Sequence, residues 1–202
     1  MKEKESNIIP PQRTGKAIDA ESGIELDEKE SKTFFSEVKS RLQNVNRWKD
    51  YAGNISATFQ LVDQSGKEIN RPVQKGDYFK IDIPGPGTAS GEGYDWVHVE
   101  EVENVITPDG ERFGLRVRPA DNPQNNKQDV AHFYSEESTS SFIVERKGNT
   151  ITASVHDRNT KPNPDAEGTA DKIRDAVVGA VGVAAFSKVQ WKNLTDGLLK
   201  KD

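Results

Sequence analysis

Residues Phe142–His156 read FIVERKGNTITASVH, and this stretch decides the fold of the 202-residue chain. Two runs rich in β-branched and apolar residues flank Lys147-Gly148-Asn149, and apolar and polar side chains alternate in the second run. Alternation places successive side chains on opposite faces of a strand, and a short glycine-containing link is typical of a hairpin turn. The stretch therefore predicts a β-hairpin.

Several runs upstream of this hairpin alternate in the same way, and turn-length gaps separate them. Thr107-Pro108-Asp109-Gly110 is a turn signal, because proline presets φ and glycine accepts positive φ. No helical crossover separates the runs, so we expect an antiparallel sheet with one apolar face. The other alternating runs are Ile55–Leu61, Gly76–Ile83, Trp96–Val102 and Arg112–Arg118.

Helical patterns precede and follow these strands. A row of apolar residues after Ser31 predicts an amphipathic helix that ends before Gly53, and a capping box of Asp27 with Glu30 starts it slightly earlier. A wide apolar stripe from Thr169 predicts a long C-terminal helix, and Ser187 is expected to cap a second, short one. The first row consists of Phe34, Val38, Leu42, Val45 and Trp48.

Residues 1–30 contain two adjacent prolines and an excess of acids without a sustained period of 2 or 3.6. We interpret them as a disordered or peripheral arm, with a docking peptide as the alternative, and residues 31–202 as a single domain.

The predicted fold class is α+β. An antiparallel sheet of six to eight strands is covered on one face by the N-terminal helix and the long C-terminal helical segment. The alternative is a small β-barrel with flanking helices. In layout the chain is similar to the helix-grip architecture of lipid-transfer domains and aromatic cyclases, in which a curved sheet wraps a long C-terminal helix around a cavity. It departs from that plan because we find no strand before the first helix.

Charge and composition exclude several functions. The chain has 28 Lys and Arg against 33 Asp and Glu, a net charge of −5, so we expect no nucleic-acid partner. It has no cysteine, which excludes disulfides, thiolate-held zinc and iron–sulfur clusters. A charged N-terminus and the absence of long apolar runs predict a soluble cytoplasmic protein without membrane insertion.

The most unusual stretch is Pro84–Trp96, which holds four glycines and two prolines between two predicted strands. Its glycine spacing does not fit a dinucleotide loop, and a strand follows where such a loop needs a helix. The stretch is either a long hairpin connection or a protruding loop that binds a protein. The candidate binding residues are Gly85, Pro86, Gly87, Gly91, Gly93, Tyr94, Asp95 and Trp96, with Arg158 as a separate anion contact.

Other polar residues give weaker signals. His98 and Glu100 share one strand face and would serve as acid and base in a pocket, whereas a solvated strand face is the alternative interpretation. Arginines of the Arg112–Arg118 run are expected to pair with acids such as Glu100 or Glu145. The three histidines lack metal-ligand spacing, and Asp157 opens a calcium-like loop that Lys161 interrupts, so no metal site or cofactor is predicted.

We therefore favour a non-catalytic intracellular binding or assembly protein that engages another protein through Pro84–Trp96. A helix-grip carrier of an apolar small molecule is the alternative, because small residues line the final helix. An enzyme built on such a cavity, with His98 and Glu100 as its acid and base, is a third hypothesis.

Overall fold

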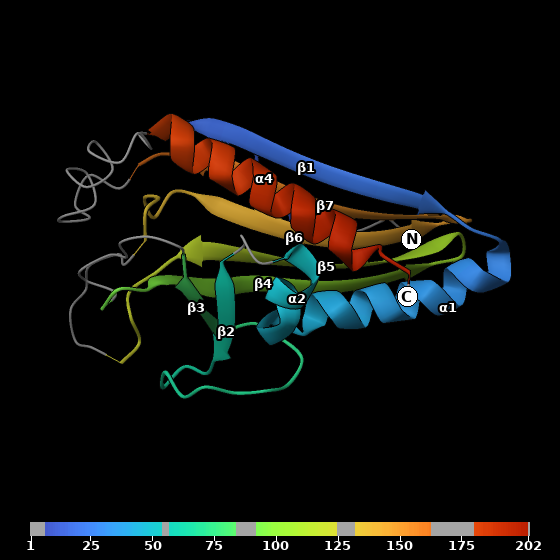
Figure 1. Ribbon diagram of the computed structural model, residues 1–202, viewed down its shortest axis with the longest axis horizontal. Coiled ribbons are helices and arrows are strands. Elements are labelled where there is room, and N and C mark those ends of the chain that lie inside the picture. The colour runs from blue at the N-terminus through green and yellow to red at the C-terminus, as the bar shows by residue number, and fades with distance from the viewer. Residues whose placement is uncertain (1–6, 54–56, 84–91, 125–131, 163–179, 202) are drawn as a thin grey trace.

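A computed structural model describes residues 7–53, 57–83, 92–124, 132–162 and 180–201 (Figure 1). Three α-helices and seven strands make up most of this part of the chain, together with a 3-10 turn at Val45–Arg47. The elements are β1 (Lys16–Glu25), α1 (Glu28–Gln43), α2 (Trp48–Ala52), β2 (Thr58–Val62), β3 (Tyr78–Asp82), β4 (Asp95–Thr107), β5 (Gly110–Pro119), β6 (Thr139–Lys147), β7 (Thr150–Thr160) and α4 (Ala180–Leu198).

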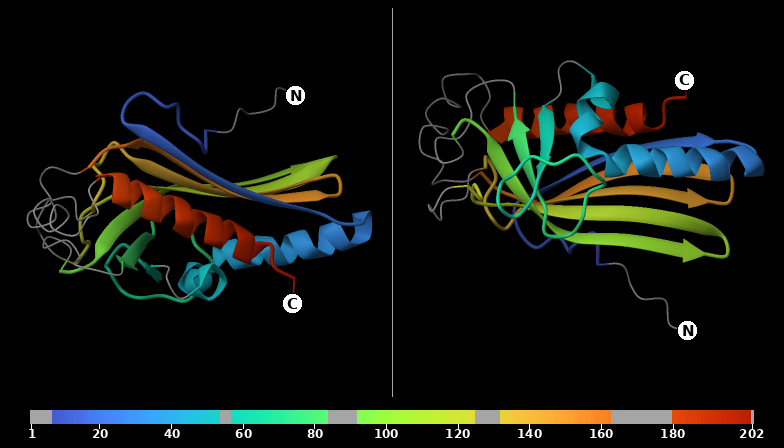
Figure 2. Two further views of the ribbon diagram at one scale, coloured as in Figure 1. Left: turned by 45° about the horizontal axis from the view of Figure 1, so that its top comes forward. Right: turned by 90° about the horizontal axis from the view of Figure 1, so that it is seen from below.

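The strands form one antiparallel sheet in the order β1-β7-β6-β5-β4-β3-β2. The sheet is curved, and the helices all lie on its concave side (Figure 2). This confirms the α+β class and the single covered face, and the two free edges, β1 and β2, rule out the closed barrel. The β6–β7 hairpin turns at Gly148, and Thr107 pairs with Gly110 in the β4–β5 turn, as the sequence predicts.

β1 corrects the prediction that residues 1–30 form a disordered or peripheral arm and that no strand precedes the first helix. Residues 16–25 pair with β7 along nearly its whole length. Its inward side chains include Ile18 and Ala20, which are buried, but also Ser22, so the hydrophobic signal of this strand is weak. With β1 in place the order of elements is the full helix-grip plan, which is the fold of this chain.

Residues 7–15, which precede β1, cross the outer, convex face of the sheet (Figure 2). Ile8 is 2% exposed and packs over Gly114 of β5, and its carbonyl accepts a hydrogen bond from the Ser141 hydroxyl at 2.6 Å. Asn159, at φ 57°, holds the backbone N–H groups of Arg13 and Thr14 with its side-chain oxygen. This part of the predicted arm is therefore bound to the sheet.

α1 begins where the capping signal predicts, because the Asp27 side chain accepts a hydrogen bond from the Glu30 N–H at 2.8 Å. All five residues of the predicted apolar row are buried. The helix breaks at Asn44, because the next turn docks on β2: the Asn46 amide oxygen accepts from the Leu61 N–H at 2.6 Å. α2 then ends at Gly53, which has φ 87°.

α4 lies across the concave face beside β1 and β7 (Figure 1). It runs through Ser187 without a break, so the predicted second helix does not exist; no proline or glycine between 183 and 196 interrupts it. Residues 169–179, where the sequence predicts the start of this helix, lie outside the described residues. Near its end α4 approaches α2 closely, since a Cβ on Gly197 would lie 2.0 Å from the Tyr51 carbonyl oxygen.

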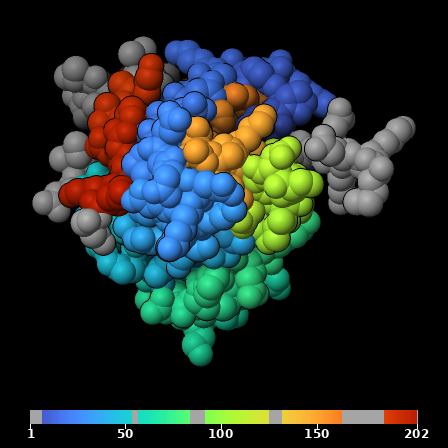
Figure 3. All heavy atoms as spheres, turned by 90° about the vertical axis from the view of Figure 1, so that its right-hand side faces the viewer, coloured from blue at the N-terminus to red at the C-terminus, as the bar shows by residue number. Residues whose placement is uncertain are grey.

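Aromatic side chains fill the centre of the concave side. The Trp48 ring is completely buried and lies 5.2 Å from Phe59, 5.6 Å from Phe79 and 4.7 Å from Phe142, measured between ring centroids. Trp191 of α4 adds an edge contact to Phe142 at 5.1 Å. Seen from the end where α1 begins, α1 lies beside the tips of the β4–β5 and β6–β7 hairpins (Figure 3). Any room for a ligand on this face must lie away from these rings.

Candidate ligand-binding site

A group of polar side chains is buried on the concave side, beneath the first half of α4. We call Asp95, His132, Tyr134, Asp157 and Ser187 the buried polar cluster. Asp95 opens β4 two residues before the core residue Val97, and Asp157 lies two residues after Val155 near the end of β7. Residues two apart in a strand share a face, so both carboxyl groups point to the helix side of the sheet. Sheet alternation thus places two acids where apolar residues would be expected.

Asp95 is 1% exposed and has little to stabilise a negative charge. Its Oδ2 accepts a hydrogen bond from the Phe133 N–H at 3.2 Å, whereas Oδ1 has no hydrogen-bond partner among the described residues. Burial raises the pKa of Asp95 to about 8, and the Phe133 N–H only partly opposes this. At neutral pH the side chain is therefore a neutral carboxylic acid.

The hydrogen bond to His132 shows which of its ring nitrogens carries a hydrogen. Its Nδ1 accepts a hydrogen bond from the Tyr134 N–H at 3.0 Å, and burial lowers the pKa of the imidazole to about 3. A neutral ring that accepts at Nδ1 carries its hydrogen on Nε2. Nε2 lies 3.8 Å from Asp95 Oδ2. This distance is too long for a hydrogen bond, so the Phe133 N–H is the donor that Oδ2 accepts. We assign the proton of Asp95 to Oδ1, the oxygen that accepts no hydrogen bond from the described residues.

Asp157 is buried to the same degree as Asp95 but has better partners. The Trp191 indole donates to its Oδ2 at 2.9 Å, while Oδ1 has no hydrogen-bond partner in the described part of the chain. Burial raises the pKa of Asp157 to about 6, against the opposing effect of hydrogen bonds from Ser140 and Trp191. At neutral pH the two acids of the cluster therefore differ in charge.

Tyr134 connects the two ends of the cluster. Its ring stacks on His132 with centroids 5.8 Å apart, and its hydroxyl lies 3.3 Å from the Ser187 hydroxyl of α4. Burial raises the pKa of Tyr134 to about 12, so the phenol stays protonated. The buried polar cluster thus contains both hydrogen-bond donors and hydrogen-bond acceptors beneath α4. Among the described residues, no three His, Asp or Glu side chains are grouped to hold a metal ion.

The structure does not bring the sequence-predicted binding residues together. Tyr94 and Trp96 lie on the convex face, where Trp96 is buried against Val62 and Lys80 lies over the Tyr94 ring at 4.3 Å. Gly93 is an exposed turn residue at φ 92°, and Arg158 pairs with Asp19 of β1. Of the predicted set, Asp95 alone belongs to the cluster. Gly85, Pro86, Gly87 and Gly91 lie outside the described residues, so binding of a protein through this stretch stays a prediction.

The acid–base hypothesis for His98 and Glu100 is wrong in its geometry. His98 lies between the core residues Val97 and Val99, so its side chain is on the convex face, where its ring is tilted against that of Tyr78 with centroids 4.9 Å apart. Glu100 forms ion pairs with two arginines of β5, and these bonds lower the pKa of Glu100 although burial opposes them. The predicted pairing of the arginines with Glu100 is confirmed: the partners are Arg116 and Arg118.

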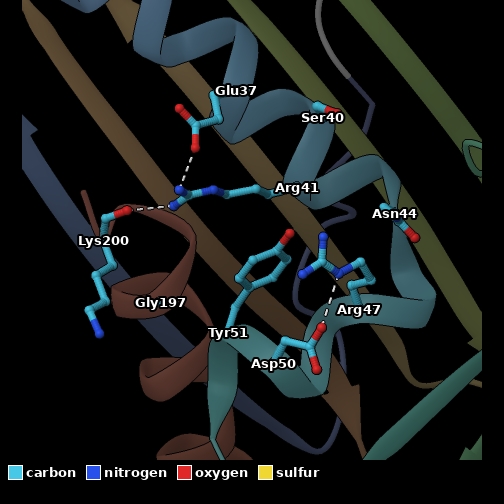
Figure 4. A pocket seen from close by; sticks show the side chains of 9 residues that line it. All are labelled: Glu37, Ser40, Arg41, Asn44, Arg47, Asp50, Tyr51, Gly197 and Lys200. Carbon is cyan, nitrogen blue, oxygen red and sulfur yellow. Dashed lines mark hydrogen bonds and ion pairs between the residues drawn. The ribbon is translucent and has the colours of Figure 1, made fainter. Parts of the chain in front are cut away.

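Away from the cluster, a hollow of about 480 Å³ opens where the ends of α1 and α4 meet α2 (Figure 4). Arg41 forms one wall, and its guanidinium donates to the carbonyls of Leu198 and Lys200 at 3.0 and 2.6 Å. Arg47 pairs with Asp50 at the rim. Carbonyl ends of two helices disfavour an anion, and both arginines of the hollow, Arg41 and Arg47, already have partners. We interpret this hollow as the clamp that holds the end of α4.

Sequence comparison finds no protein-family model and no curated protein that matches the chain. Solved structures do match. Hypothetical protein jhp0584 from Helicobacter pylori is 15% identical with a TM-score of 0.50, over 92% of this chain and 89% of that one. Norcoclaurine synthase from Thalictrum flavum also matches, with 7% identity and a TM-score of 0.38 over 87% of this chain and 84% of that one. A START superfamily protein from Mycobacterium smegmatis matches with 9% identity and a TM-score of 0.37 over 90% of this chain and 100% of that one. At such identities the likeness concerns the fold alone.

None of the helices in the described part of the chain has the length and apolar character needed to span a membrane.

Proposed function

We propose that the protein binds a small, largely apolar molecule at the buried polar cluster, between α4 and the ends of strands β4 and β7. The observation that carries this proposal is the pair of buried carboxyl oxygens, Asp95 Oδ1 and Asp157 Oδ1, without a hydrogen-bond partner among the described residues. Buried polar atoms in proteins are nearly always hydrogen-bonded, so an orphaned pair on one face calls for a further partner. A bound molecule supplies one.

The aromatic packing around Trp48 sets the extent of the site. Because these rings fill the centre of the concave side, the ligand lies at the α4 N-terminal end rather than along the whole sheet. Trp191 separates the two regions, with its ring against Phe142 and its N–H on Asp157. The site thus combines an apolar wall with a polar end, which is the usual composition of small-molecule sites.

A blocking variant tests the location. Ser187→Phe places a ring among the cluster, while Val189→Phe adds the same ring to the same helix at a side chain that is 50% exposed. With the neutral dye Nile red as the probe, we expect saturable binding to the unmodified protein and to Val189→Phe. Ser187→Phe should weaken it by about 10-fold or more, the equivalent of roughly 1.4 kcal/mol.

Equal affinity of the two variants for Nile red would contradict the proposed location. Near-UV circular dichroism of each variant establishes that it is folded before the titration. Ser187→Leu is a smaller block and serves if the phenylalanine disturbs the packing of α4. Native mass spectrometry of the protein purified from its own cells would then identify the natural ligand.

A further inference from the structure

We infer that the ligand presents a neutral hydrogen-bond acceptor, such as a carbonyl oxygen, to the Oδ1–H of Asp95. This inference rests on the proposed binding function and names the chemical class that the site selects. A buried acid suggests at first a cationic ligand such as an amine. The contacts around Asp95 favour a neutral ligand instead.

The hydrogen bonds around Asp95 assign each of its oxygens a role. Oδ2 accepts a hydrogen bond from the Phe133 N–H at 3.2 Å, and Nε2 of His132 lies 3.8 Å from it, beyond hydrogen-bond distance. An oxygen that accepts a hydrogen bond from an N–H is not the protonated one, so the hydrogen of the neutral acid is on the other oxygen. Oδ1 is that oxygen, and it has no acceptor within the described residues. The Oδ1–H of Asp95 is therefore a buried donor that needs an acceptor.

An ionised Asp95 would need more support than the structure provides. Carboxylates that stay charged when buried accept two or three hydrogen bonds or lie beside a cation. Within the described residues the Asp95 carboxyl group has one hydrogen bond, from Phe133, and the other titratable groups of the cluster are a neutral imidazole, a phenol and a second carboxyl group. A cationic ligand would also lose its hydration on entering. A neutral carbonyl satisfies the donor without separating charge.

Three naphthalenes of one size test the choice. 2-Acetylnaphthalene carries a carbonyl, 1-(2-naphthyl)ethylamine carries an ammonium group, and 2-ethylnaphthalene carries neither. Affinities are measured by ligand-observed NMR at pH 6.5. We expect the ketone to bind about 10-fold more tightly than the hydrocarbon, which corresponds to one buried hydrogen bond, and the amine to bind weakest.

Two substitutions at Asp95 separate a neutral donor from a charge. Asp95→Asn keeps an acceptor for Phe133 and an N–H donor at the position of Oδ1, so ketone affinity should stay within about 3-fold. Asp95→Leu has a similar volume and no donor, so the ketone should fall to the affinity of the hydrocarbon. Ketone binding to the unmodified protein should weaken between pH 7 and 9, and binding to Asp95→Asn should not.

Tighter binding of the amine, or its loss in Asp95→Asn, would overturn the inference. Equal affinity for all three naphthalenes would also overturn it, while leaving a binding site in place. If none of the three binds, and Nile red does not bind either, the proposed function itself fails. Both substituted proteins are compared with the parent by near-UV circular dichroism, and Asp95→Asn alone decides the question if Asp95→Leu does not fold.

Discussion

Replacing Asp95 by asparagine should change how stability depends on pH. Burial raises the pKa of Asp95 from 3.8 to about 8, so the folded protein keeps a proton that the unfolded chain releases. Below pH 4 Asp95 is protonated in both the folded and the unfolded state, so its pKa shift does not change the unfolding free energy. As pH rises from 4 to 8 the unfolding free energy should fall, because deprotonation favours the unfolded chain. Asparagine does not titrate, so this loss should be absent.

The magnitude follows from the width of that window. Each unit of pKa difference is worth about 1.4 kcal/mol, and the window spans about 4 units, so the effect is on the order of 5 kcal/mol. Typical domains unfold at about 5–15 kcal/mol, so the unmodified protein should be markedly less stable at pH 8.5 than at pH 5 on this account. Asp95→Asn should gain stability relative to its parent across the same range.

Urea denaturation between pH 4 and 9 measures this, with the unfolding free energy of the parent subtracted from that of Asp95→Asn at each pH. The subtraction removes the contributions of His132 and Asp157, which are present in both proteins. The difference should rise by about 1.4 kcal/mol per pH unit and level off above pH 8. Asp82→Asn, at an exposed position, controls for the loss of a charge. A difference curve that stays flat from pH 5 to 8 would refute the reasoning.

Two further predictions concern the clamp at the end of α4. Arg41→Met should destabilise the fold by about 2–4 kcal/mol in urea, because buried carbonyls such as that of Leu198 lose a charged donor. Arg47→Met should leave the unfolding free energy nearly unchanged, since that side chain is 58% exposed, and an equal loss of stability in the two variants would contradict the clamp. Gly197→Ala should lower the melting temperature and loosen α4 in hydrogen exchange, because its Cβ would meet the Tyr51 carbonyl at 2.0 Å.

Much of the sheet follows from alternation and turn residues alone. The Phe79 and Ile81 side chains point inward, the β6–β7 turn lies at Lys147–Asn149, and the helix row ending at Trp48 is buried as its spacing predicts. These features depend on local pattern, which a single sequence displays. The number of strands, seven, falls within the predicted range.

β1 could not be recognised in this way. Its inward positions alternate Ile18, Ala20 and Ser22, too small and too polar to stand out from the acids between them. Its stability comes from pairing with β7 and from contacts with α4, where the Ser22 hydroxyl meets Thr195 at 2.8 Å. Those partners lie more than a hundred residues away, and no local rule reveals them.

Two members of the buried polar cluster can be recognised from the alternation of their strands. Asp95 is in phase with the core residues Val97 and Val99, and Asp157 is in phase with Ala153 and Val155. An acid on the apolar face of a strand is a buried acid, and such acids gather at functional sites. From the sequence, Asp95 is instead assigned to the glycine-rich stretch Pro84–Trp96, which we interpret as a loop. His132 and Ser187 join the cluster through tertiary packing, so their part in it could not be predicted from the sequence.

The pairing of β1 with β7 also bears on how the chain folds as it is made. Glu25 and Thr150, partners in the sheet, lie 125 positions apart. At a synthesis rate of about 5–20 residues per second, the ribosome releases β7 roughly 6–25 s after β1. During that interval the first strand has no edge to join, and the sheet is completed only after β7 has been synthesised. Such distant pairing slows folding, and a nascent chain interrupted before β7 would carry an unpaired strand open to other proteins.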